Sequence, residues 1–323
     1  MKRTLAVLGA ALALAAGGVA AQSADNWPSR PVTLIVAVSA GASVDFEARL
    51  WANKLTELMG KTFLVDYKPG AGTTIGTAYV AKSAPDGHTL LVTSPSFTMA
   101  ALSYSNLPYD NDRDFAPVSL MTKRGSMFLV HPQIPVKTMA EYFAYTHANP
   151  GKINIGTSGP GGVGHMSLEQ LHLLTKSKVT FVHYKGGAPS YAAIVKGEVD
   201  VVYGGPTAMM QHVKSGKLRI LAFSTLERTR ILPDVPAISE TVPGYEYALW
   251  LGVTAPGATP PAIVNKLSAE LAKVAKAPEV AGKLEADSAT MVGSTPEFFR
   301  KHIAAETARL RKIIQETGIK PGE

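Results

Sequence analysis

The sequence predicts an α/β fold of two doubly wound lobes. Short apolar or β-branched runs, mostly continuous rather than alternating, occur at residues 31–38, 62–67, 88–93, 152–156, 179–184, 199–203 and 218–224. Continuous runs indicate strands that are covered on both faces, which is typical of parallel sheets under helices. Helical patterns lie between these runs, so strands and helices alternate along the chain as in doubly wound folds.

Helices are predicted where apolar residues recur every three or four positions. This spacing is clear from Ala48 to Leu58 and from Ile263 to Val274. Three helix starts are marked by a Thr cap, one in a capping box and two with Pro at the first helical position: Thr138 with Glu141, Thr259 with Pro260, and Thr295 with Pro296.

Two segments are expected to connect the lobes. Residues 115–131 and 245–256 lack a helix signal, and each is long enough to carry a strand from one lobe to the other. The helical C-terminus from residue 259 onward should then pack back on the first lobe. The length of 323 residues suggests two domains, although one large α/β domain would also fit. We expect residues 22–124 and 243–323 to form lobe I and residues 125–242 to form lobe II, with hinge bending about the two connecting strands.

The first 21 residues have the pattern of a secretory signal peptide. Lys2 and Arg3 precede an apolar run at residues 5–19, and small residues lead up to an expected cleavage site after Ala21. An uncleaved anchor is the alternative, but the run is short for a membrane span. No later apolar stretch reaches the roughly 18 residues that such a span needs. The mature protein is therefore expected to be soluble and exported.

Composition excludes several kinds of chemistry. The chain has no Cys, so disulfides, thiolate metal sites and cysteine nucleophiles are excluded. Without Lys2 and Arg3, 30 basic residues face 25 acidic ones, and this modest excess is spread along the chain, with no basic stripe for nucleic acid. No His pair has the spacing of metal ligands, and no P-loop is present. A dinucleotide motif at Gly159, Gly161 and Gly164 lacks the acidic residue that should follow about 20 positions later. We expect neither a metal nor a cofactor.

Small polar loops follow three of the predicted strands. Residues 39–45 and 156–165 each lead directly into a predicted helix, and residues 94–98 follow the third strand. At such loops, backbone N–H groups and the positive end of a helix dipole can point at one anion. A single loop of this kind would be read as a tight turn, but two of them in separate lobes favour a ligand cleft. An exported hydrolase stays open as an alternative, with Ser158 or Ser94 as nucleophile and a distant His, although the hydrolase motif is incomplete around Ser158.

Several motifs together resemble one family of binding proteins. The segment WPSRP at residues 27–31 and LIVAVSAGASVDFEAR at residues 34–49 are similar to the opening YPSKPIRLIVPFPAGGGTDVIAR of the Bug-type periplasmic receptors of tripartite tricarboxylate transporters. Further matches keep order and spacing over essentially the whole mature chain, at residues 69–72, 84–91, 156–165, 184–189, 232–236 and 243–245. The resemblance implies a periplasmic solute receptor of the type II periplasmic binding protein fold, with a ligand cleft between its lobes.

The resemblance also implies how a ligand is held. In that family, main-chain amides of the two glycine-containing loops bind one carboxylate, and no catalytic group or metal is needed. Carried over, the ligand-binding residues are Ser39, Ala40, Gly41, Ala42, Ser43, Val44, Asp45, Thr157, Ser158, Gly161 and Gly162. The implied partners are a small organic acid and a membrane permease of the tripartite tricarboxylate type, and the receptor itself is expected to be a monomer.

Departures from the family pattern suggest what the ligand is. Ser39 and Ser43 add hydroxyls that could bond the ligand. Glu47 replaces an apolar residue; it could meet an ammonium or hydroxyl group of the solute, but we expect a solvent-facing helix residue without a function. Gly204 stands near the place of an acidic residue that the family often has, which would remove an anchor for amino acids and open room.

Aromatic residues near these loops favour a larger or aromatic carboxylate. They are Phe46, Phe97 and Tyr191, and they could equally belong to the core. Phe97, Tyr191 and Gly204 therefore join the candidate ligand-binding residues.

Overall fold

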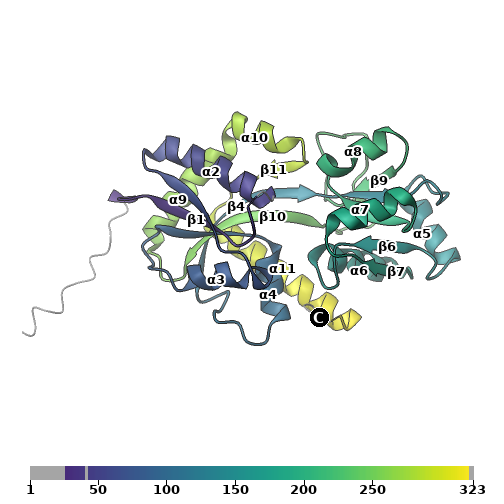
Figure 1. Ribbon diagram of the computed structural model, residues 1–323, viewed down its shortest axis with the longest axis horizontal. Coiled ribbons are helices and arrows are strands. Elements are labelled where there is room, and N and C mark those ends of the chain that lie inside the picture. The colour runs from purple at the N-terminus through teal and green to yellow at the C-terminus, as the bar shows by residue number, and fades with distance from the viewer. Residues whose placement is uncertain (1–25, 41–42, 320–323) are drawn as a thin grey trace, which may run out of the picture.

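The computed structural model describes residues 26–40 and 43–319, which form a mixed α/β protein with two sheets. We call the part around the six-stranded sheet the first lobe and the part around the five-stranded sheet the second lobe (Figure 1). The predicted signal peptide lies outside the described residues. None of the helices in the described part of the chain combines the length and the apolarity that a membrane crossing requires.

The sheet of the first lobe combines strands from both ends of the chain. Its order is β11-β4-β10-β3-β1-β2. The strands are β1 (Val32–Val36), β2 (Phe63–Tyr67), β3 (Thr89–Thr93), β4 (Phe115–Gly125), β10 (Ala248–Pro256) and β11 (Ala289–Met291). β1 pairs parallel with β2 and β3, whereas β10 runs antiparallel to both β3 and β4. The sheet is therefore parallel on one side and antiparallel on the other.

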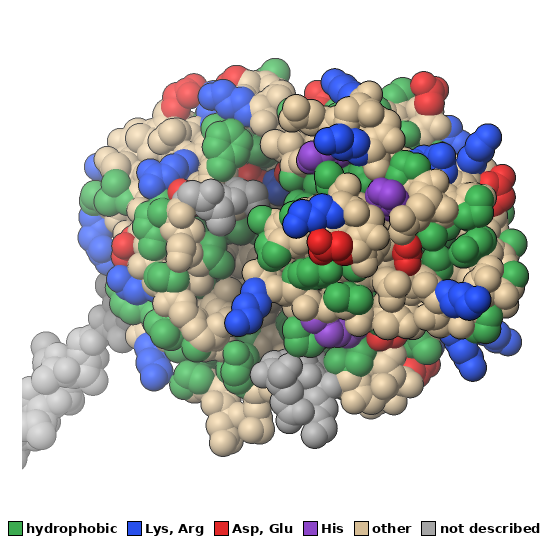
Figure 2. All heavy atoms as spheres, turned by 45° about the vertical axis from the view of Figure 1, so that its right-hand side comes forward, with side chains coloured by type: hydrophobic (Ala, Val, Ile, Leu, Met, Phe, Trp, Pro, Cys, Tyr) green, Lys and Arg blue, Asp and Glu red, His purple; other side chains and the backbone are tan. Residues whose placement is uncertain are grey.

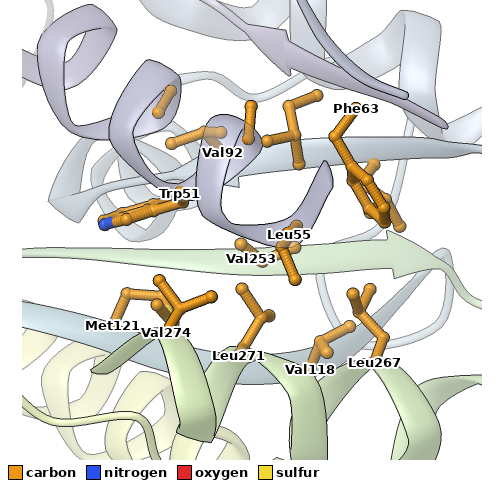
Figure 3. Packing of buried hydrophobic residues seen from close by; sticks show 14 of the residues in the cluster. Trp51, Leu55, Phe63, Val92, Val118, Met121, Val253, Leu267, Leu271 and Val274 are labelled. Carbon is orange, nitrogen blue, oxygen red and sulfur yellow. The ribbon is translucent and has the colours of Figure 1, made fainter. Parts of the chain in front are cut away.

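Helices cover both faces of this sheet, in addition to a short 3-10 turn η2 (Ala71–Thr73). They are α2 (Ser43–Met59), α3 (Thr74–Ala81), α4 (Pro95–Ser103), α9 (Pro261–Lys276), α10 (Pro278–Glu285) and α11 (Pro296–Thr317). On one face, α2 and α9 pack next to each other over β10. Trp51 and Leu55 of α2 and Leu267 and Leu271 of α9 are all buried in this cluster (Figure 3). These are the apolar positions that the helical spacing predicts. The last of the predicted set on α2, Leu58, remains 38% exposed.

The sheet of the second lobe has the order β7-β6-β8-β5-β9. Its strands are β5 (Met127–Val130), β6 (Asn154–Thr157), β7 (Thr180–His183), β8 (Val201–Gly204) and β9 (Arg219–Phe223). Its helices are α5 (Met139–Ala148), α6 (Val163–Thr175), α7 (Gly187–Lys196) and α8 (Pro206–Lys214), with the short η3 (Ile238–Glu240). β6 pairs parallel with β7 and β8, as predicted, but β5 lies antiparallel between β8 and β9. The antiparallel strand is the one that enters from the first lobe.

Two strands connect the lobes, as the sequence predicts. β4 continues into β5 with only Ser126 between them, and β10 returns to the first sheet, where it pairs with β4 along its whole length (Figure 1). Near the return, the Tyr247 N–H donates to the Ser224 carbonyl at 2.7 Å. The connection is therefore a paired ribbon rather than a flexible linker.

Two of the three predicted helix caps are confirmed. The Thr138 hydroxyl accepts from the Glu141 N–H at 3.1 Å, and the Thr295 hydroxyl accepts from the Phe298 N–H at 3.3 Å. The third prediction is wrong by one residue, because α9 begins at Pro261 with Pro260 at its cap position. A second Pro at residue 261 takes the first helical position, where its missing N–H costs nothing.

The C-terminal helix α11 contacts both lobes. It packs on the first sheet through Phe299 and Ile303, as expected for a helical C-terminus that folds back. Its second half carries Leu310 and Ile313 into a buried cluster with Met99 of α4 and Met166 of α6. α11 therefore forms a third link between the lobes, which Figure 1 shows in yellow running toward α6.

Candidate functional site

The surface is hollowed between the two lobes (Figure 2), and a cavity of about 280 Å³ lies on the second-lobe side of the connection. It is lined by Ser126, Gly156, Thr157, Ser158, Val163, Gly164, His165, Leu168, Ser190, Tyr191, Tyr203, Tyr247 and Leu249. These residues come from the end of β6, the start of α6, the helix α7, the end of β8 and the two connecting segments. The cavity therefore lies at the carboxyl ends of parallel strands, where open α/β sheets usually bind ligands.

The loop between β6 and α6 forms one wall of the cavity. Gly162 is the cap residue of α6 and offers no side chain to the first helical amides, so the helix start is left for another acceptor. Val163 and Gly164 at this start line the cavity, and so do Thr157 and Ser158. A helix N-terminus beside two hydroxyls favours an anion, because amides, hydroxyls and the helix dipole all present positive charge.

Two histidines hold this loop in place. The Gly161 N–H donates to His165 Nδ1 at 3.0 Å, and His183 Nδ1 lies 2.7 Å from the Thr157 hydroxyl oxygen. The two rings meet edge to face with their centroids 4.6 Å apart. The amide of Gly161, a predicted ligand donor, is therefore bonded inside the loop. No motif in the sequence indicated this supporting role of the two histidines.

Tyrosines form another part of the cavity wall. The rings of Tyr203 and Tyr247 are stacked at 5.3 Å between centroids, and the hydroxyls of Tyr203 and Tyr245 are 2.7 Å apart. The Tyr245 hydroxyl in turn donates to the Ser167 carbonyl at 2.9 Å. Tyr191 completes the wall, and its burial raises the pKa of its hydroxyl, so it is neutral. Tyr191 was predicted, whereas Tyr203 and Tyr247 were missed; the position of Tyr203 at the end of a predicted strand could have indicated it.

The predicted first-lobe loop lies between β1 and α2. Ser39 and Ala40 are exposed after β1. Gly41 and Ala42 lie outside the described residues, and Ser43 begins α2. The end of the strand before Ser39 and the start of the helix at Ser43 therefore lie where the sequence predicts them.

Two further residues of the predicted loop lie in the first turn of α2. Val44 is half-buried and lines a small cavity of about 20 Å³ with Ser94 and Phe97. The Asp45 carboxylate lies 2.7 Å from the Arg49 guanidinium and accepts from the Tyr67 hydroxyl at 2.5 Å. The side chain of Asp45 is therefore engaged within the first lobe.

Phe97 and Gly204 lie inside the lobes and do not line the cavity of about 280 Å³. Phe97 is 3% exposed and packs edge to face on Phe115 at 5.1 Å. A Cβ on Gly204 would lie 2.7 Å from a side-chain carbon of Met209 and 2.9 Å from one of Leu129. The expected extra room at Gly204 is therefore already filled, and Phe97 belongs to the core. Phe46 is 50% exposed on the first turn of α2.

Glu47 is not solvent-facing, which corrects the expectation from the sequence. Its side chain is only 1% exposed, and one carboxylate oxygen accepts from the Thr122 hydroxyl at 2.7 Å. The other oxygen is hydrogen bonded to the Arg124 guanidinium, which also lies 3.2 Å from Asp287. Burial raises the pKa of Glu47, and the charge of Arg124 opposes that rise. Glu47 of α2 therefore faces the end of β4, and this contact between distant segments could not be read from residue spacing.

The arrangement around Ser158 does not resemble a hydrolase site. His165 accepts from Gly161 and His183 contacts Thr157, so neither of the two histidines beside the loop is bonded to Ser158. Among residues 26–40 and 43–319, no three His, Asp or Glu side chains are grouped so that they could hold a metal ion. The features that remain are those of a binding cleft.

Comparisons with known proteins agree with this geometry. Residues 47–319 match the model of the tripartite tricarboxylate transporter family receptor. The chain is 33% identical to BugT of Bordetella pertussis over 324 residues, with 99% of each chain covered. It is 34% identical over 317 residues to a protein encoded in the tcbD-tcbE intergenic region of Pseudomonas sp. strain P51, covering 98% of this chain and 94% of the relative.

Solved structures with the same fold include two ligand complexes. R. palustris Rpa4515 with adipate has a TM-score of 0.75 and 34% identity, covering 91% of this chain and 99% of that one. MatC from Rhodopseudomonas palustris with bound malate has a TM-score of 0.70 and 29% identity, covering 89% and 100%. These similarities confirm the predicted two-lobed fold and indicate a receptor rather than an enzyme. The chain belongs to the receptor family of the tripartite tricarboxylate transporters.

Proposed function

We propose that the cleft captures a small carboxylated organic anion, a dicarboxylate or an aromatic carboxylate, which the receptor delivers to a membrane permease of the tripartite tricarboxylate type. The observation that carries this proposal is the uncapped start of α6 beside the Thr157 and Ser158 hydroxyls in the cavity wall. The adipate and malate complexes of similar structures support a carboxylate as the ligand. We propose a periplasmic location after cleavage at Ala21, with the receptor acting as a monomer.

The carboxylate is held mainly by backbone amides in this proposal. The second lobe supplies Thr157, Ser158 and the start of α6 after Gly162, while the Gly161 amide supports the loop through His165. The first lobe supplies the loop from Ser39 to Asp45. Three or four charge-assisted hydrogen bonds at about 1.5–3 kcal/mol each offset an association cost of about 4 kcal/mol or more.

The body of the anion meets the tyrosine wall. Tyr191, Tyr203 and Tyr247 give the cavity an aromatic side, and Leu168 and Leu249 add apolar surface. The residues that line the cavity include no Asp or Glu to hold an ammonium group. This composition supports acids with an apolar body over amino acids.

Lobe closure would complete the site. We propose that the hinge lies near the expected lobe boundaries, residues 124–125 and 242–243. The direct step from β4 to β5 at Ser126 and the bond from Tyr247 to Ser224 support this position, since both lie next to cavity-lining residues.

A charge placed in the cavity wall tests the proposal. Ser158 is exposed to the cavity, so Ser158→Asp should leave the fold intact but repel a carboxylate and weaken adipate or benzoate binding at least about tenfold. Ser105→Asp, on the exposed surface after α4, is the matched control and should bind like the wild type. Binding is measured by calorimetry after a thermal-shift screen of organic acids, in which a ligand at 100 times Kd stabilises the protein by about 2.7 kcal/mol. Unchanged affinity in Ser158→Asp, or turnover of an ester by the purified protein, would contradict the proposal.

A further inference from the structure

A carboxylate of the first lobe reaches across to the second lobe. Asp287 follows α10, and its Oδ1 accepts from the Thr207 N–H at 3.2 Å in the first turn of α8. A Cβ added to Gly205 would lie 3.4 Å from the same oxygen, so Asp287 lies directly against the start of α8. A negative charge here is favourable, because the amides at a helix start carry partial positive charge. Asp287 thus joins the lobes by a polar contact that is separate from the connecting strands.

Arg124 continues this contact into the interior of the first lobe. It lies at the end of β4, its side chain is only 12% exposed, and its guanidinium lies between Asp287 and Glu47. Glu47 is in the second turn of α2, the helix that begins at Ser43 and follows the proposed binding loop. One positive charge therefore links two carboxylates, and through them the start of α2 and the start of α8.

The other end of this series of contacts reaches the cavity. The Tyr191 hydroxyl, in the tyrosine wall, lies close to the backbone of Gly205, the cap residue of α8. Each end of the chain of contacts therefore lies next to a part of the proposed binding site, one in each lobe. None of Glu47, Arg124 and Asp287 lines the cavity itself.

We propose that Glu47, Arg124 and Asp287 are positioning residues that latch the two lobes in the binding arrangement and so set ligand affinity without touching the ligand. This proposal rests on the proposed function, because it concerns the same cleft. Charges this far out of water interact more strongly than surface pairs, and removal of one partner leaves the others uncompensated. Loss of the latch should therefore let the lobes separate more readily, and the bound anion should leave faster.

The test compares Asp287→Ala with Asp112→Ala, which removes the same charge from an exposed loop of the same lobe. With adipate as the probe, we expect Asp287→Ala to raise Kd about tenfold, mostly through faster dissociation, and to weaken the dependence of affinity on salt. Asp112→Ala should bind adipate like the wild type. If Asp287→Ala does not fold, Asp287→Asn removes the charge with little change of shape and takes its place.

A second pair of variants separates positioning from structural support. Arg124→Lys keeps the charge and should restore part of the affinity that Arg124→Met loses, with both variants measured in samples that circular dichroism shows to be folded. Wild-type affinity and dissociation rate in Asp287→Ala would overturn the latch.

Small-angle scattering keeps this result distinct from failure of the proposed function. If the wild type binds no organic acid, the carboxylate-receptor proposal fails, but the latch still predicts that unliganded Asp287→Ala is more expanded than the wild type and Asp112→Ala. Equal radii of gyration for the three proteins would overturn the latch on its own.

Discussion

His172 of α6 is a buried histidine whose ring is bonded on both sides. Its Nδ1 lies 2.7 Å from the Leu168 carbonyl, so this nitrogen carries the proton, and its Nε2 accepts from the Tyr142 hydroxyl at 3.0 Å. Burial lowers the pKa of His172 to about 4. The ring is therefore neutral in the folded protein at all but acidic pH.

This lowered pKa predicts a pH-dependent stability. Between about pH 6.5 and 4 the unfolded chain takes up a proton at His172 that the folded protein does not, so the free energy of unfolding falls by up to about 3 kcal/mol as the pH drops. His172→Gln should remove this part of the change in the free energy of unfolding with pH. His147→Gln, at an exposed ring, should keep it. Urea unfolding at several pH values measures the slopes, and equal slopes for the wild type and His172→Gln would refute the assignment.

Individual residues were predicted well where their contacts are close along the sequence and poorly where their contacts are far apart along it. Thr138 and Thr295 cap helices within three residues of their partners, so sequence spacing is sufficient to identify them. Glu47 meets Thr122 and Arg124, which are more than 70 positions away along the chain, and its burial follows only from the folded arrangement. The same applies to Tyr247, which joins the cavity because the second connecting segment passes beside β8.

At the scale of elements, the strand β10 shows how closely the helices fit the sheet. At Gly252 an added Cβ would lie 2.3 Å from the Phe299 ring of α11 and 2.8 Å from the Ser119 carbonyl oxygen. There is no space for a side chain at this point, where the register of β10 on β4 also shifts. The glycine is therefore needed for the approach of α11.

This close approach predicts opposite effects at two glycines. Gly252→Ala should lower the free energy of unfolding by about 1–3 kcal/mol, because the methyl group displaces Phe299 or the strand. Gly282→Ala, inside α10 with nothing within 4 Å of the added Cβ, should instead stabilise by about 0.5–1 kcal/mol through helix propensity. Chemical denaturation of both variants tests the difference, and a Gly252→Ala protein as stable as the wild type would be inconsistent with it.

The elements themselves were largely predictable, but the direction of the strands that pass between the lobes was not. Continuous apolar runs identify β1, β3, β6 and β8 because those strands are covered by helices on both faces. The same pattern carries no information on direction, so β5, which arrives from the other lobe, could not be recognised as antiparallel.

At the scale of the whole molecule, a buried cluster joins the two lobes. Leu310 and Ile313 of α11 and Met99 of α4 pack against Met166 of α6 in the second lobe. Arg309 adds a polar contact, with its guanidinium donating to the Gln170 side chain at 2.7 Å. The helix α6 that presents its start to the cavity therefore rests on the first lobe along its side.

Removal of this support should be costly. Leu310→Ala is expected to lower the free energy of unfolding by about 2–5 kcal/mol, because a fully buried side chain is lost and a void remains between the lobes. Leu226→Ala, at a side chain that is 50% exposed, should change it by less than about 0.5 kcal/mol. Equilibrium unfolding in urea measures both, and similar midpoints for the two variants would argue against the cluster as a link.

The composition of the two sheets has a consequence for how the protein is made. All five strands of the second sheet lie within one continuous stretch, from Met127 to Phe223, so this sheet can form as soon as that stretch is available. The first sheet needs β10 and β11 from the last third of the chain to pair with β3 and β4. Such distant pairing is slow, because a long loop must close before any contact is gained. Synthesis of the chain up to β9 therefore provides every strand of one sheet while the other still lacks two of its six, and completion of the first lobe is expected to limit the rate of folding.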